Sequence, residues 1–473
     1  MFKSGLILSA TNITATFLGL LRNVLIARLI SVEDFGIAST FAIAMSLVEM
    51  TSNIALDRLI IQARDGDKPM LQATAQAINA ARGAIGAVVL FLAAEPLARF
   101  FGIPEIAWTY QLLALTPLIR GLAHLDLFRL QREMLFASFV RVELASQGLS
   151  TIAAVMFSLW LTDYRAMLYT LLLQQVIFTI ATHTIAGRPY QWAWERAIVR
   201  RAIDFGWPLL VNSLLMFGIF TGDQFIVGSL IGMTELGWFS AAFALTLSPS
   251  IIVTKTLQSF FLPQLSKLQD EKDAFCQLAT VTMQAAMLAG IVYLVLLVTV
   301  GSPLFITLYG SKYEPALAVF LWLAVMQCFR IAKAGPICVA VSKGKTTNPL
   351  IANTMRLLMF PCAALLVLNG SGMVTVVYLG IAGELLAFFM SIFLVRLSLR
   401  SNKLDLSSPI LAFIVLCALT MANFLFWTSP SATLQFDQLI LVLPALVAYW
   451  TMRSFRNWAK EIVRPLRVRL EMN

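Results

Sequence analysis

Charged side chains lie inside several long apolar segments of this chain, where they are costly and therefore informative. A charge at the middle of a bilayer costs about 2.5–3.5 kcal/mol on insertion scales, so it usually faces a partner, a ligand or water. The charges placed in this way comprise six cations and three acids, namely Arg22, Glu49, Arg82, Arg120, Asp223, Arg330, Lys333, Arg356 and Glu384. The excess of positive charge favours water or an anionic ligand among them.

Two interpretations of these charges compete. In the first, each charge pairs with another inside its own helix bundle and holds helices together, as Arg82 would with Glu49. In the second, the arginines line a cavity and bind an anion, because the bidentate guanidinium is well matched to pyrophosphate. A structure with every arginine ion-paired inside its bundle and no polar cavity would contradict the second interpretation.

Helical spacing places some of these charges beside other polar residues. Glu49 shares one face of its predicted helix with Ser46 and Asn53, and Arg82 lies beside a polar stripe that contains Asn79. These segments are therefore expected to turn a polar face away from lipid.

The segment of residues 2–39 recurs at residues 203–240, and this repeat organises the chain. The offset is a constant 201 residues; it aligns Gly36 with Gly237 and places Asp223 at the position of Arg22. A repeat of this length predicts two similar halves. Six predicted spans precede the second copy, so both halves have the same orientation, and a substrate site is expected between them near the membrane midplane.

The composition predicts an all-α protein that crosses the membrane many times. Hydrophobic residues make up 59% of the chain and charged residues 13%, against roughly 25% charged in soluble domains. About 20 apolar residues span the hydrocarbon. We predict fourteen spans, or twelve if one weak pair is misjudged, near residues 5–27, 37–56, 73–94, 107–128, 138–160, 164–186, 205–230, 236–256, 277–300, 316–339, 348–368, 373–396, 409–428 and 436–453.

Basic residues gather in alternate loops, from Arg58, Arg64 and Lys68 to the C-terminal tail. By the positive-inside rule these loops and both termini are cytoplasmic. The formal charge of +10 then reflects loops beside an anionic membrane face, and no nucleic-acid partner is expected.

The predicted domains follow the repeat. They are an N-terminal six-helix lobe (1–190), an interfacial linker (191–204), a C-terminal six-helix lobe (205–400), two additional transmembrane helices (401–455) and a basic cytoplasmic tail (456–473). Trp192 and Trp194 lie beside Arg196 and its basic neighbours, which favours a helix on the membrane interface over an ordinary solvated linker.

Several functions are disfavoured. The chain has no Walker A motif, no paired-histidine metal spacing and no nucleophile elbow, and the external loops are too short for a catalytic domain, so neither an enzyme nor a metal site is expected. The two histidines, His124 and His183, are interpreted as packing or interfacial residues in preference to proton relays.

Two stretches give the chain a family likeness. They are the run Leu21–Gly36, with its turn Ser31-Val32-Glu33-Asp34-Phe35-Gly36, and Arg188-Pro189-Tyr190 leading to Ile203–Pro208. With the fourteen-span layout, the chain resembles the polysaccharide-biosynthesis branch of the multidrug/oligosaccharidyl-lipid/polysaccharide flippase superfamily, the Wzx-like flippases. The likeness covers essentially the whole chain.

This resemblance implies two pseudo-symmetric six-helix bundles in a V, as in multidrug-extrusion (MATE) transporters, plus two C-terminal helices. It implies alternating access and movement of an undecaprenyl-pyrophosphate-linked glycan, such as an O-antigen, exopolysaccharide or capsule precursor, from the cytoplasmic to the periplasmic leaflet. The implied location is the bacterial cytoplasmic membrane, with membrane lipids and a polysaccharide polymerase as expected partners.

The resemblance also implies roles for the buried charges. Family members line their cavity with basic residues, which would here be Arg22, Arg82, Arg120, Arg330 and Arg356. Glu49, Asp223 and Glu384 would be candidates for coupling to a proton or a sodium ion, and no other cofactor is expected. Asp223 departs from the pattern, because it is an acid at the position symmetric to Arg22.

Three alternatives stay open. A multidrug or cation antiporter would favour twelve spans and an acid-lined cavity. A flippase for the peptidoglycan lipid precursor would share the physics and differ in the head group. A scaffold in a glycan-assembly complex would not transport, and neutralising Arg22 or Arg330 would matter little to it.

Overall fold

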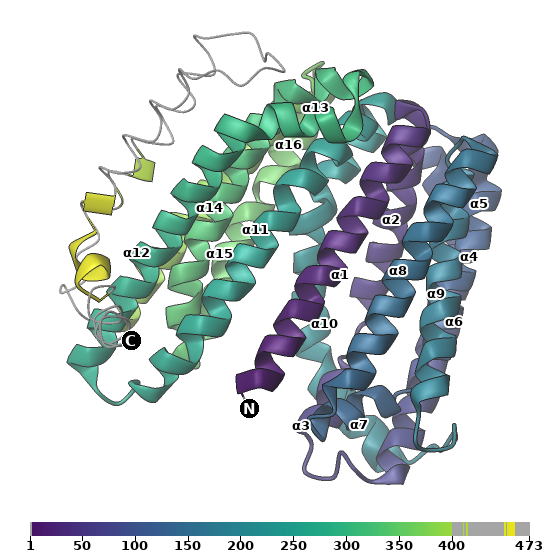
Figure 1. Cartoon of the computed structure of the whole chain (residues 1–473), viewed down its shortest axis with the longest axis horizontal. Coiled ribbons are helices and arrows are strands. Elements are labelled where there is room, and N and C mark those ends of the chain that lie inside the picture. The colour runs from purple at the N-terminus through teal and green to yellow at the C-terminus, as the bar shows by residue number, and fades with distance from the viewer. Residues whose placement is uncertain (1, 400–409, 411–412, 415–448, 451, 459–473) are drawn as a thin grey trace, which may run out of the picture. The chain divides into compact units, whose positions relative to one another are not determined.

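The computed structural model describes residues 2–399, 410, 413–414, 449–450 and 452–458 (Figure 1). The regular structure of these residues is helical, with no strand among them. The chain divides into two compact units, Met1–Ala241 (unit 1) and Ala242–Asn473 (unit 2). The domain limits predicted from the repeat stay a prediction. Unit 1 includes α10 (Arg196–Leu230) and the first turns of α11 (Met233–Lys267).

Unit 1 contains ten α-helices, a short 3₁₀ helix (Pro104–Ile106) and the start of an eleventh α-helix among its described residues. They are α1 (Phe2–Leu29), α2 (Val32–Ser52), α3 (Leu56–Gln62), α4 (Pro69–Phe100), α5 (Ala107–Leu113), α6 (Leu115–Gly121), α7 (Asp126–Arg132), α8 (Phe136–Leu161), α9 (Arg165–Ile185), α10 (Arg196–Leu230) and the first turns of α11 (Met233–Lys267). Helix α8 packs on α1 and α9, α4 packs on α5 and α6, and α10 packs on α2.

Unit 2 is built around one buried helix. After α11 come α12 (Lys272–Leu296), a π-helical turn, α13 (Ser302–Tyr309), α14 (Leu317–Ser342), α15 (Thr347–Leu357), α16 (Met359–Leu368) and α17 (Met373–Leu399). Helix α14 packs against α12 and α17 and is buried along nearly its whole length. This burial explains why its polar residues must find partners inside the unit.

The multi-pass, all-helical fold is confirmed. Eleven helices of the described chain are long and apolar enough to cross a membrane. Each matches one of the predicted spans; 107–128 is the predicted span in the described region that has no such helix. The predicted spans 409–428 and 436–453 and the tail fall mostly outside the described residues, so the total of fourteen stays a prediction.

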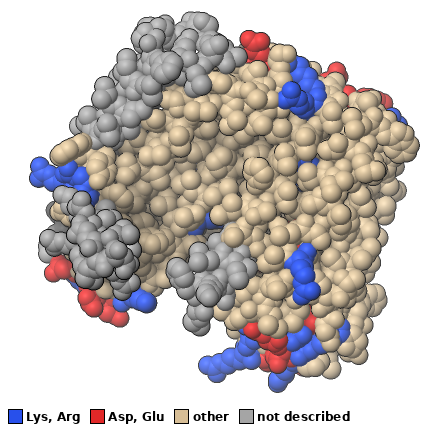
Figure 2. All heavy atoms as spheres, viewed as in Figure 1, with Lys and Arg blue, Asp and Glu red and all other residues tan. Residues whose placement is uncertain are grey.

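Helices of this composition present apolar side chains to their surroundings. On the face shown in Figure 2, lysine, arginine, aspartate and glutamate gather mainly at the helix ends, and the surface between is largely free of them. Exposed leucine, isoleucine and phenylalanine side chains on α4 and α8 agree with this view. Lipid solvates such surfaces, so these apolar side chains need not be buried inside the protein as they would be in a soluble one.

The predicted span 107–128 is wrong as a continuous helix. It is divided into α5 and α6 and is followed by the separate helix α7. Pro117 explains the division, because it has no N–H to give to the carbonyl of Leu113. The Thr116 hydroxyl donates to that carbonyl instead, at 2.7 Å.

The predicted linker, 191–204, is helical in its second part alone. The backbone from Ala186 to Glu195 is not helical, and α10 begins only at Arg196. Trp192 and Trp194 remain 63% and 62% exposed, so their predicted place at the membrane interface stays a prediction for an extended segment.

The two copies of the repeated turn touch each other within unit 1. A Cβ on Gly36 would lie 1.8 Å from the carbonyl oxygen of Met233, and one on Gly237 would lie 2.2 Å from that of Val32. The contact is reciprocal, which explains why both copies carry glycine at this position. Only a residue without a Cβ permits this approach.

Candidate functional site

A polar cavity of about 200 Å³ lies within unit 1. Residues from α2, the following turn, α3, α4, α6, α7, α9 and the loop between α6 and α7 line it. Its polar and charged lining side chains are Glu49, Asn53, Asp57, Asn79, Arg82, Arg120, His124 and Thr182. Three residues predicted for function, Glu49, Arg82 and Arg120, therefore meet at one cavity.

Close helix packing brings the two arginines to the same cavity. A Cβ on Gly83 of α4 would lie 2.5 Å from the carbonyl oxygen of Pro117 and 2.7 Å from the Cα of Gly121. Small residues at such crossings let helix backbones approach one another. Arg82 precedes Gly83 and Arg120 precedes Gly121, so the same crossing fixes both guanidinium groups at the cavity wall.

Arg82 is only partly satisfied by the protein. Its Nη2 donates to the side-chain oxygen of Asn79 at 3.0 Å. Asn79 is itself held by its amide nitrogen, which donates to the carbonyl of Gly121 at 2.9 Å and so caps the end of α6. The Arg82 Nε is buried and has no hydrogen-bond partner in the part of the chain that the structure describes.

Arg120 is held by an aromatic ring more than by hydrogen bonds. Its guanidinium carbon lies 3.6 Å from the centroid of the Phe178 ring, a cation–π arrangement. Its Nη1 donates weakly to the Gln175 side chain at 3.5 Å. Stacking leaves the edge of the guanidinium free to donate to a ligand in the cavity.

Two carboxylates balance the two arginines. Glu49 from α2 and Asp57 from α3 line the cavity, and neither forms a salt bridge within 4.0 Å with another described residue. The expected pairing of Arg82 with Glu49 is thus not formed at that distance. The cavity is mixed in charge, which differs from the expected excess of cations.

His124 lines the cavity and lies in the loop after α6, outside the eleven described helices that are long and apolar enough to cross a membrane. Its Nδ1 accepts from the backbone N–H of Asp126 at 3.1 Å and from the Gln76 amide at 3.2 Å. Its Nε2 donates to the carbonyl of Arg188 at 3.0 Å. Burial lowers the pKa of His124, although the Asp126 carboxylate acts in the opposite direction.

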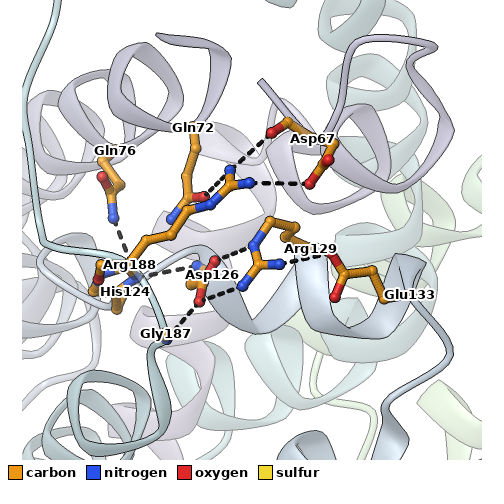
Figure 3. Close-up of polar contacts among 9 residues, drawn as sticks. All are labelled: Asp67, Gln72, Gln76, His124, Asp126, Arg129, Glu133, Gly187 and Arg188. Atoms are coloured by element: carbon orange, nitrogen blue, oxygen red, sulfur yellow. Dashed lines mark hydrogen bonds and ion pairs between the residues drawn. The ribbon is translucent and has the colours of Figure 1, made fainter. Parts of the chain in front are cut away.

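Beyond His124, a set of polar and ionic contacts fastens the non-helical segment 186–195, hereafter called the linker, to the rest of unit 1 (Figure 3). Asp126, which is fully buried, accepts from the Gly187 backbone N–H at 2.8 Å and from Arg129 at 2.5 and 3.0 Å. Arg188 donates to the carbonyl and carboxylate of Asp67 at 2.8 and 3.1 Å. The segment that leads into α10 is therefore anchored at Gly187 and Arg188.

Arg22 lies away from the cavity lining. Its Nη1 donates to the side chains of Gln174 on α9 and Ser150 on α8, at 2.5 and 3.3 Å. Its Nε is buried and has no partner among the described residues. These neutral contacts tie α1 to α8 and α9, and a substrate role for Arg22 stays a prediction.

The predicted residues of unit 2 meet in a buried ionic cluster. Glu384 on α17 accepts from Arg330 Nε at 3.0 Å and from Lys333 Nζ at 2.8 Å, both on α14. The Nε of Arg356 on α15 lies 3.7 Å from the same carboxylate, and Lys333 also contacts Asn353 at 3.4 Å. The four charged residues are at most 8% exposed.

The structure thus sorts the predicted residues into different surroundings. Arg330 and Arg356, which the resemblance assigned to substrate binding, both contact Glu384, which it assigned to ion coupling. Such contacts are what the interpretation of charges pairing inside a bundle expects. Asp223 lies buried on α10, 2% exposed, and is not among the lining residues of the cavity. The binding and coupling roles of all eight residues stay predictions.

The sequence indicated some of the other lining residues and gave no sign of the rest. Asn53 was indicated by its spacing from Glu49, and its side chain accepts from the Ala55 N–H at 2.8 Å, which holds the turn after α2. Phe178 and Asp57 gave no signal, because nothing in their spacing marks a contact with α6 or α4. His124 was interpreted as a packing residue, and its place between cavity and linker depends on the fold.

Comparison with known proteins gives a consistent picture. The profile of a family described as polysaccharide biosynthesis protein matches residues 25–318, more than half of the chain. A succinoglycan biosynthesis transport protein, ExoT of Rhizobium meliloti, is 22% identical over 64% of this chain and 61% of its own. An uncharacterised membrane protein in the cps region of Klebsiella pneumoniae is 21% identical over 56% of this chain and 55% of its own. The aligned regions thus span less than two thirds of these relatives.

Solved structures share the fold. The lipid II flippase MurJ in an inward closed conformation aligns over 98% of this chain and 99% of its own, with a TM-score of 0.70 and 14% identity. An inward-facing MATE multidrug resistance transporter aligns over 82% of this chain and 96% of its own, with a TM-score of 0.61 and 15% identity. At such identities the similarity concerns the fold alone.

Proposed function

Because the chain belongs to the polysaccharide biosynthesis protein family, we propose that it carries a lipid-linked oligosaccharide across the membrane. The substrate is an undecaprenyl-pyrophosphate-linked repeat unit, moved from the cytoplasmic to the periplasmic leaflet by alternating access. The membrane is the bacterial cytoplasmic membrane, with both termini in the cytoplasm.

One observation carries the proposal, namely the pair Arg82 and Arg120 at a cavity that also offers carboxylates and amides. Guanidinium groups bind phosphate oxygens through charge-assisted hydrogen bonds, and Arg82 has a buried N–H with no described partner. Carboxylate and amide oxygens accept hydrogen bonds from hydroxyls. The cavity can therefore receive a group that combines phosphate with a sugar.

The physics of the lipid carrier agrees with such a site. The polyprenyl chain stays in hydrocarbon, so the protein needs to solvate only the charged and hydroxylated head group during transfer. The cavity arginines offset the desolvation of the phosphates, a cost that otherwise prevents crossing. A ligand shifts the balance between conformations only by binding one of them better.

The test is transfer of a labelled undecaprenyl-pyrophosphate saccharide in proteoliposomes that contain the full chain. Arg82→Gln and Arg120→Gln are compared with Arg99→Gln, which lies on the same helix as Arg82 but is exposed and paired with Glu95. A hydrogen bond to a charged group is worth about 1.5–3 kcal/mol, so each cavity variant should lower transfer roughly 10- to 150-fold. Arg99→Gln should leave it unchanged.

A second candidate, a cation antiporter, is favoured by Glu49 and Asp57 at the same cavity. It predicts gradient-driven efflux of a cationic dye that Glu49→Gln abolishes, with no saccharide transfer by the wild type.

Transfer that survives both arginine variants would support the flippase but would show that Arg82 and Arg120 are not in the binding site. Loss of transfer in Arg82→Lys as well would show that the planar, bidentate guanidinium group is needed in addition to its charge.

A further inference from the structure

The chain contains two histidines, and the fold brings them together. The rings of His124 and His183 lie 5.3 Å apart, and Tyr190 of the linker lies 5.5 and 4.9 Å from them. His124 is 2% exposed and lines the cavity. The Tyr190 hydroxyl is buried and has no hydrogen-bond partner among the described residues.

The contacts of His124 define one tautomer. Two N–H groups, from the Asp126 backbone and the Gln76 side chain, point at Nδ1, so this nitrogen carries a lone pair and no proton. The Arg188 carbonyl at Nε2 requires a proton there. His124 is therefore neutral in this arrangement, with its proton on Nε2.

We propose that His124 is a proton-binding site that fastens the linker 186–195 to unit 1 when neutral and loosens it when protonated. The inference does not depend on which molecule is transported. It assigns to His124 a role that links the cavity to the segment joining the two repeats.

The consequence of protonation follows from the contacts. A proton on Nδ1 removes the acceptor for the Asp126 N–H and places a cation beside the Asp126 carboxylate. That carboxylate now accepts from Gly187 at 2.8 Å and from Arg129, and the imidazolium competes with both. Gly187 is one of the two linker anchors, so the linker loosens at Gly187, whereas the Nε2–H bond to the Arg188 carbonyl is kept on protonation.

The charged groups around His124 act in both directions. Asp126 favours the proton, whereas Arg129 on α7 and His183 on α9 oppose it. Arg188 turns its carbonyl to the ring and its guanidinium to Asp67. On the cavity side, the lining includes two carboxylates, Glu49 and Asp57, and two arginines, Arg82 and Arg120. Burial is the largest influence and lowers the pKa of His124, so proton uptake is expected below the ordinary histidine value of about 6.5.

The experiment uses the full chain in nanodiscs with isotope-labelled histidine, because two side chains give a spectrum simple enough to assign. In the His183→Gln variant His124 is the one remaining histidine, so all histidine signals belong to it. We expect nitrogen shifts of an Nε2–H tautomer at pH 8 and a titration of His124 below pH 6.5. Hydrogen exchange of the peptide covering 186–195, measured against His124→Gln at the same pH, should rise about fivefold with the same midpoint, as for loss of one hydrogen bond.

Comparing both proteins at each pH removes the intrinsic effect of pH on exchange. His183→Gln should keep the response, and His124→Gln should lack it. An Nδ1–H tautomer at high pH, linker exchange that stays constant through the titration, or a response that persists in His124→Gln would overturn the proposal. Should His124→Gln fail to fold, the tautomer and midpoint in His183→Gln still decide it.

Discussion

Replacing Glu384 by glutamine should destabilise unit 2 strongly. This carboxylate holds Arg330 at 2.9 Å and Lys333 at 2.8 Å, and Arg356 lies 3.7 Å away. All four side chains are at most 9% exposed. Glutamine has nearly the same shape but no charge, so the three cations would remain buried without their carboxylate.

The expected magnitude follows from what breaking a buried ion pair costs. Removal of one partner destabilises a protein by about 3–5 kcal/mol, because an uncompensated charge remains. For a unit of about 150–250 residues, 1 kcal/mol shifts Tm by about 2–4 °C. Glu384→Gln should therefore lower the Tm of the unfolding step of unit 2 by roughly 6–20 °C.

The assay is thermal unfolding of the purified full chain in detergent. Glu95→Gln is the matched control, because Glu95 pairs with Arg99 where the two side chains are 62% and 70% exposed. Exposed pairs contribute about 0–1 kcal/mol, so the control should shift Tm little. Adding Lys333→Met to Glu384→Gln should recover part of the loss, as a double-mutant cycle would measure.

A Tm shift for Glu384→Gln no larger than for Glu95→Gln would refute the reasoning. It would mean that the cations are stabilised by something other than this carboxylate. Failure of Lys333→Met to recover any stability would show that charge balance in the cluster is not the source of the effect.

Two further changes test other contacts. Gly36→Ala should destabilise unit 1, because the added Cβ would lie 1.8 Å from the backbone oxygen of Met233. The control is Gly19→Ala, which should be neutral because nothing lies within 4 Å of the added Cβ. Equal Tm values for the two variants would contradict the reciprocal contact. Asp65 accepts two hydrogen bonds from Arg201 at 3.0 and 3.1 Å, which lower the pKa of its carboxyl. The stabilising effect is thus present above the unfolded pKa of about 3.9 and lost as pH falls through the folded value. Asp65→Asn should therefore lower the free energy of unfolding by about 0–1 kcal/mol near pH 7, and the Tm values of wild type and variant should converge in acid.

Periodicity found the parts of the cavity that lie on single helices. Glu49 and Asn53 share a face of α2, and Asn79 and Arg82 lie one turn apart on α4, so the spacing of 3.6 residues was enough to group each pair. It could not show that the two faces and Arg120 meet. That depends on the crossing of α4 and α6, where the contact is between backbone atoms.

The break in the fourth span had a signal in the sequence, because Pro117 lies in the middle of the apolar segment. The prediction of one helix over 107–128 used apolar length and did not weigh this proline, whereas the structure has α5 and α6 there. The position of His124 had no such signal. Its partners come from α4, α7 and a linker more than 60 residues away, and no local pattern reports contacts of that separation.

Partner choice among buried charges was the other limit. The sequence offered three acids for six cations, and composition cannot rank the pairings. Glu384 meets Arg330 and Lys333 because α14 packs on α17, and it meets Arg356 because α15 packs on α17 as well. Helix packing thus decided which charges neutralise one another.

The two units use their arginines differently, although the repeat relates them. Arg120 lies in the fourth predicted span of the first half and Arg330 in the fourth predicted span of the second. Arg120 stacks on Phe178 beside a cavity, whereas Arg330 binds a buried carboxylate. A carboxylate already satisfies the charge of Arg330, so binding a phosphate there would first require breaking a pair worth several kcal/mol. Arg82 and Arg120 face no such cost, since neither forms an ion pair with a described carboxylate. For this reason we propose that an anionic head group would bind in unit 1, whereas the cluster of unit 2 holds α14, α15 and α17 together.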